Sequence, residues 1–96
     1  MSLEQRHIAG ARAREVLENE AFQDAFSAIE SELIEQWKTS PARDQEGREK
    51  IWTYLSMLRK VKATLEATMD SGKLAALEIE HKKTMRERLG LTSWLG

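Results

Sequence analysis

Apolar residues recur at every third or fourth position over two long stretches of the chain, with charged residues between them. Steps of three and four residues place side chains on one side of an α-helix and leave the other side to water. The first stretch ends just before the single proline, Pro41, and the second follows it. The pattern predicts two helices, over about residues 20–38 and 44–70, that form an antiparallel hairpin around Pro41. The apolar positions are Phe22, Phe26, Ile29, Leu33 and Trp37 in the first helix and Ile51, Leu55, Leu58, Leu65 and Met69 in the second.

Local signals set the ends of these two helices. Asn19 and Asp44 are N-cap candidates, because a short polar side chain accepts hydrogen bonds from the first amides of a helix. Pro41 ends the first helix, since the residue before a proline leaves the α conformation. Residues 70–72, Asp-Ser-Gly, form a stop signal for the second helix, although one long helix that bends at Gly72 remains an alternative.

Weaker helical patterns flank the hairpin on both sides. Residues 3–17 predict an N-terminal helix with Gly10 in its middle, where glycine costs about 1 kcal/mol relative to alanine. Residues 73–89 predict a C-terminal helix, for which Gly90 supplies a C-cap. The expected fold is therefore all-α, a small helical bundle that forms a single domain over residues 1–90, followed by an apolar tail at residues 91–96.

The composition excludes several classes of protein. Cysteine is absent, which removes disulfides, thiolate metal sites and a thiol nucleophile. No apolar run approaches the roughly 20 residues that cross a bilayer, and the polar N-terminus is unlike an export signal. The formal net charge of -1 favours no partner by itself. We expect no membrane association and a reducing compartment.

Catalytic signals are limited to two Glu-x-x-His spacings, Glu4 with His7 and Glu78 with His81. Carboxylate-bridged di-metal bundles use this spacing, but they need further glutamates from neighbouring helices. Because both pairs lie in polar terminal segments, solvated side chains are the favoured interpretation. The chain also lacks a G-x-S-x-G elbow, a P-loop and an H-E-x-x-H motif. We expect a protein that is not an enzyme, with no catalytic residues, metal or cofactor.

Charge is unevenly distributed along the chain. The predicted helix over residues 20–38 has five acidic residues and one lysine, a net charge of -4. Either this acidic helix lies beside a basic one, which is the favoured interpretation, or the basic residues form a surface for nucleic acid or an acidic partner. The basic residues concerned are Arg59, Lys60 and Lys62 in the second helix and Lys82, Lys83, Arg86 and Arg88 near the C-terminus.

The chain has more apolar side chains than the core of a two-helix hairpin would bury. Trp37 and Trp52 are expected to pack across the turn. Tyr54 and Val61 widen the apolar face of the second helix beyond what one neighbour covers, which indicates contact with another helix or another subunit. The tail either folds back on its own domain or docks on a neighbour. Its apolar members are Leu91, Trp94 and Leu95. We predict a protein partner, including a second copy of the chain.

Three motifs resemble those of small helical proteins from the head and packaging gene clusters of tailed bacteriophages. They are an acidic helix ending in Trp37, an Arg/Asp/Glu-rich turn over residues 40–51 leading to Trp52, and a basic helix followed by Gly72-Lys-Leu. The likeness covers about residues 14–75. It implies a virion or assembly component, in the host cytoplasm or the virion, that oligomerises and contacts capsid, connector or packaging proteins. Two alternatives are a nucleic-acid-associated packaging adaptor that uses the basic residues, and a regulator that binds a host protein through residues 20–35.

Overall fold

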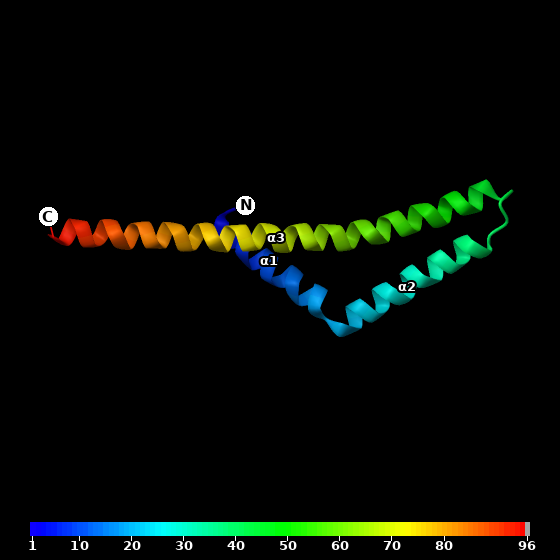
Figure 1. Cartoon of the computed structure of the whole chain (residues 1–96), viewed down its shortest axis with the longest axis horizontal. Helices are drawn as coiled ribbons and strands as arrows, with labels where there is room; N and C mark the ends of the chain where they lie inside the picture. The colour runs from blue at the N-terminus through cyan, green and yellow to red at the C-terminus, as the bar shows by residue number, and fades with distance from the viewer. Residues whose placement is uncertain (96) are drawn as a thin grey trace.

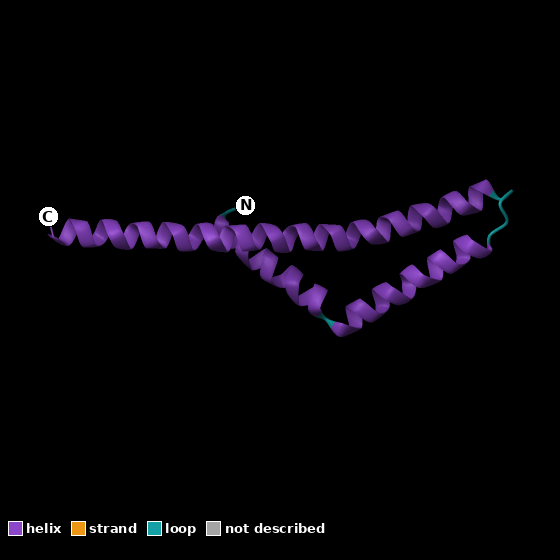
Figure 2. Cartoon of the chain, in the orientation of Figure 1, coloured by secondary structure: helices purple, strands orange, loops and turns teal. Residues whose placement is uncertain are grey.

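The computed structural model describes residues 1–95, and the side chains of residues 1–90, as an almost wholly helical chain. Three helices follow one another: α1 (Leu3–Glu18), α2 (Glu20–Thr39) and α3 (Gln45–Leu95). Figure 2 shows that helix and loop account for all of this part of the chain, with no strand. The all-α prediction is confirmed.

The helices form an open, elongated frame instead of a compact bundle. α3 has 51 residues and runs the length of the molecule, α1 crosses it near the middle, and α2 returns from the end of α1 to the start of α3 (Figure 1). The molecule measures 79 × 25 × 16 Å, and its radius of gyration is 21.9 Å. A compact domain of this length has a radius of gyration of roughly 12.5 Å. The expected arrangement of a hairpin within a small bundle is therefore not confirmed.

Each helix begins at a polar side chain that caps its first turn. Ser2 Oγ, Asn19 Oδ1 and Asp44 Oδ1 each accept a hydrogen bond from an amide three residues ahead, at 3.1, 2.9 and 3.1 Å. These bonds satisfy amides that have no partner within the helix. The predicted caps at Asn19 and Asp44 are confirmed, and α2 ends within one residue of the predicted end.

The predicted end of the second helix at residues 70–72 and the predicted C-cap at Gly90 are both wrong. α3 continues through both positions, so the alternative of one continuous helix holds. A glycine C-cap adopts the left-handed conformation. Neither Gly72 nor Gly90 has a positive φ angle. A glycine inside a helix costs only about 1 kcal/mol relative to alanine, which is too little by itself to end a long helix.

Gly72 lies where α1 crosses α3, with its backbone directly against that of Gly10. A Cβ atom added to either glycine would lie 2.6 Å from the Cα of the other. Ala13 and Ala75 flank this crossing and are only 4% and 0% exposed. The two glycines, each of which lowers the helix propensity of its segment, therefore allow the backbones of α1 and α3 to approach closely.

Side-chain contacts fix the crossing and the position of α2. Arg6 of α1 donates from Nε to Ser71 Oγ at 3.0 Å and from Nη2 to the Ser71 carbonyl at 3.3 Å. On α2, Phe26 is 9% exposed and lies under the ammonium group of Lys62 from α3, 5.2 Å from the ring centroid. These contacts supplement a core that contains few large side chains.

Substitution of the crossing glycines tests the helix contact. In an open helix, glycine to alanine stabilises by about 1 kcal/mol. We expect Gly72→Ala to lower the free energy of unfolding by about 1–3 kcal/mol instead, because the new methyl group overpacks the crossing. The matched control is Gly90→Ala, where an added Cβ meets nothing within 4 Å. Thermal unfolding followed by circular dichroism, at one protein concentration, measures both. Equal stabilisation by the two substitutions would contradict the close contact.

Candidate interaction surface

The chain exposes more surface than a compact protein of its size would. The accessible area of the chain is 7746 Å². A compact monomer of 11.0 kDa exposes roughly 5,600 Å². The excess, roughly 2,100 Å², exceeds the roughly 800 Å² that each partner buries in a standard protein interface. Met1 and large apolar side chains on all three helices contribute to it, and those on the helices are Ile8, Val16, Ile29, Trp37, Trp52, Tyr54, Met57, Val61, Leu74, Leu77, Met85 and Leu89.

A first part of this surface lies on α3, and we call it the central stripe: Tyr54, Met57, Val61 and Leu65. Tyr54, Met57 and Val61 are 59%, 58% and 51% exposed, and their spacing of three and four residues puts them on one side of the helix. A shallow groove of about 360 Å³ follows the stripe. Its lining is Met57, Lys60, Val61, Thr64 and Leu65. Tyr54 and Val61 were predicted, whereas Met57, at the same helical spacing between them, was missed.

A second part is the distal arm, residues 79–90 of α3, which extends beyond the start of α1 (Figure 1). Met85 and Leu89 on this arm are 43% and 64% exposed. A groove of about 660 Å³ lies where the arm leaves α1. It is lined by Leu3, Glu4, Ile79, Lys82, Met85, Arg86 and Leu89. The arm thus presents basic and apolar side chains together.

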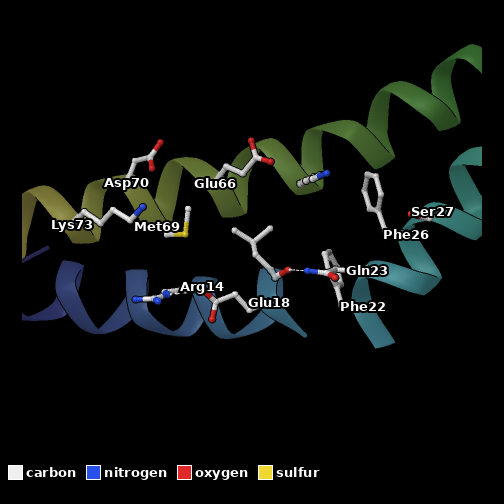
Figure 3. A pocket seen from close by; sticks show the side chains of 12 residues that line it. Arg14, Glu18, Phe22, Gln23, Phe26, Ser27, Glu66, Met69, Asp70 and Lys73 are labelled. Atoms are coloured by element: carbon white, nitrogen blue, oxygen red, sulfur yellow. Dashed lines mark hydrogen bonds and ion pairs between the residues drawn. The ribbon is translucent and has the colours of Figure 1, made fainter. Parts of the chain in front are cut away.

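A third part is the open groove between the three helices, about 860 Å³ in volume (Figure 3). Phe26 of α2 and Met69 of α3 point into it from opposite sides, and charged residues form its rim. On the rim, Arg14 Nε donates to Glu18 Oε1 at 2.8 Å, which raises the pKa of Arg14. The groove thus combines four apolar side chains, Leu17, Phe22, Phe26 and Met69, with charges of both signs.

The predicted basic residues do not form one surface. Arg59 Nε lies 3.3 Å from Glu30 Oε2 of α2, and Lys62 lies over Phe26, so both hold α2 beside α3. Lys60 lines the groove along the central stripe. The other four, Lys82, Lys83, Arg86 and Arg88, belong to the distal arm. The two groups lie roughly 30 Å apart along α3, at 1.5 Å per residue.

The expected packing of two tryptophan rings across the turn does not describe the structure. Trp37 and Trp52 are 43% and 58% exposed. The guanidinium of Arg48 lies 4.1 Å from the centre of the Trp37 ring, and Arg48 Nη1 donates to the Ser40 carbonyl and to Ser40 Oγ at 3.2 and 3.1 Å. Arg48 reaches Trp37 and Ser40 because it lies one helical turn after the Asp44 cap. Sequence reasoning missed it.

Some predicted features give no site geometry. The side chains of Leu91, Trp94 and Leu95 lie outside the described residues. The two Glu-x-x-His spacings lie on α1 and α3, and within the described residues no group of three or more His, Asp or Glu is placed to hold a metal ion. In the same part of the chain, no helix combines the length and apolar character needed to span a bilayer.

Comparisons with protein-family models, with curated proteins and with solved structures found no match to this chain.

Replacement of Arg48 tests its contact with Trp37 and Ser40. We expect Arg48→Met to lower the free energy of unfolding by about 1 kcal/mol, since it removes a cation–π contact and hydrogen bonds at the turn. Lys50→Met is the control, because Lys50 is exposed and reaches only Glu46, at 3.9 Å. Thermal unfolding, with tryptophan fluorescence as a second signal, compares them. If both variants have the same free energy of unfolding, the contact of Arg48 with Trp37 and Ser40 does not contribute to stability.

Proposed function

We propose that this protein is a non-enzymatic helical interaction protein that assembles with copies of itself and with other proteins through its exposed apolar faces. The observation that carries the proposal is the excess of roughly 2,100 Å² of surface over a compact monomer. The excess contains polar and apolar area together; burial of its apolar part would stabilise an assembly by about 25 cal/mol per Å² before the costs of association are subtracted.

The shape of the chain supports the same function. Within the described side chains, the buried apolar ones are Ala13, Phe26, Leu55 and Ala75. A long helix gains most of its stability from packing of its apolar side, and the distal arm has little such packing in one chain. An elongated frame with uncovered stripes suits a component that becomes stable within an assembly.

The resemblance to head and packaging proteins of tailed bacteriophages suggests the specific setting. There the protein would act in virion assembly, between capsid, connector or packaging proteins. A second candidate is a packaging adaptor that binds nucleic acid. It is favoured by Lys82, Lys83 and Arg86, which form no ion pair within the described part of the chain. Phosphate contacts would make such binding weaken steeply as salt rises.

Light scattering of the purified protein tests the assembly proposal. We expect an assembly with a mass at least twice that of one chain, which is 11.0 kDa. The fraction of the protein in this assembly should rise with protein concentration. Val61→Glu should lower the association constant by about tenfold or more, because it puts a charge into the centre of an apolar interface. Ser56→Glu introduces the same charge on the same helix outside the central stripe.

The helical content of both variants is checked by circular dichroism. The assembly proposal fails if the wild-type protein stays at the mass of one chain up to high concentration and captures no virion component. The central stripe is not the interface if Val61→Glu and Ser56→Glu associate equally well.

A further inference from the structure

The outward side of α2 is acidic and has little bulk. Counting 100° per residue, Asp24, Glu32 and Glu35 lie on the side of the helix opposite Phe26, which α2 turns toward α3. Within the described part of the chain, Glu30 is the one acidic residue of α2 that forms an ion pair. Three small exposed residues lie among the carboxylates. We call this surface the acidic face of α2: Ala21, Asp24, Ala25, Ala28, Glu32 and Glu35.

The distal arm has the complementary character. It carries four basic and two acidic residues, a net charge of +2 with histidine neutral. Lys82 and Arg86 line the same groove as the apolar Met85 and Leu89. Large apolar side chains between cations match small alanines between carboxylates in both shape and charge.

These two surfaces are far apart within one chain. α2 lies beside the first part of α3, whereas the distal arm extends past α1 toward the other end of the molecule (Figure 1). Lys62, which reaches Phe26 of α2, and Lys82 on the arm are roughly 30 Å apart along α3, at 1.5 Å per residue. The acidic face and the arm therefore meet only between two copies.

We propose that the distal arm of one copy docks on the acidic face of α2 of a second copy. Met85 and Leu89 pack against the alanines, and Lys82 and Arg86, which share their side of the helix, lie against the carboxylates. The dimensions agree, because α2 is roughly 30 Å long and the arm roughly 18 Å. Each chain offers one arm and one acidic face, so two chains that exchange arms form the smallest closed assembly. This inference rests on the proposed self-association and names its partner and contact.

Charge reversal tests the contact on the full-length chain. The arm variant is Lys82→Glu/Lys83→Glu/Arg86→Glu, and the face variant is Asp24→Lys/Glu32→Lys/Glu35→Lys. We expect each variant alone to associate at least about tenfold more weakly than wild type, since like charges then face each other. An equimolar mixture of the two should associate again, because both arm-to-face contacts regain opposite charges. Light scattering reports the mass, and circular dichroism confirms that each variant is helical.

A third variant, Arg12→Glu/Arg43→Glu/Lys50→Glu, changes the net charge as much as the arm variant does but lies outside both surfaces. It should associate like wild type. Added salt should weaken the wild-type association, since screening acts on these exposed charges.

Three results would overturn the arm contact. If both reversal variants associate like wild type while Val61→Glu does not, the contact is wrong and the assembly function stands. If the variants dissociate but their mixture does not associate again, the charges do not face each other across an interface. If the wild-type protein is monomeric and binds a labelled DNA duplex through the arm cations, the arm is a nucleic-acid surface and both proposals fail.

Discussion

The contact on which the whole frame depends is the close backbone approach of Gly10 and Gly72. It sets the point and the depth at which α1 crosses α3. α1 is joined to α2 by the single residue Asn19, which ends one helix and caps the next. α2 is joined to α3 by a short turn at its other end. The crossing of α1 and α3 therefore also determines where α2 lies. A side chain at either glycine would move α1, and α2 would have to move with it.

This geometry explains why so much apolar surface stays uncovered. α1 packs on α3 around Gly72 and contacts only the start of the distal arm, and α2 packs on α3 near the turn, so most of the arm and the central stripe stay uncovered. The one-residue link at Asn19 prevents α1 and α2 from lying side by side along α3 as a compact bundle would require. Gln23 Nε2 reinforces the corner by donating to the Leu17 carbonyl at 2.8 Å. The small core and the large surface thus have one origin.

The parts of the fold that depend on local interactions could be predicted from the sequence. The caps at Asn19 and Asp44 act within their own first turns, so residue type and position were sufficient. Gly72 could not be assigned in this way, because glycine serves equally as a left-handed C-cap and as a site of close helix packing. Its role depends on Gly10, which is 62 positions away in the chain. The same limit applies to Arg48, whose contact with Trp37 depends on how the turn folds.

Apolar contacts alone would leave the register of an assembly poorly defined. The stripes of α3 repeat every three or four residues, so a neighbouring helix could slide by one turn and bury nearly the same area. In the proposed arm contact, charge would reduce this ambiguity, because the pairing of basic and acidic surfaces favours docking of the arm on the acidic face of α2 over other pairings of helices. The separation of charge within a nearly neutral chain would have this role in the proposed assembly. In the proposed assembly, burial of apolar surface would supply the stability, and the pairing of unlike charges would select which surfaces meet.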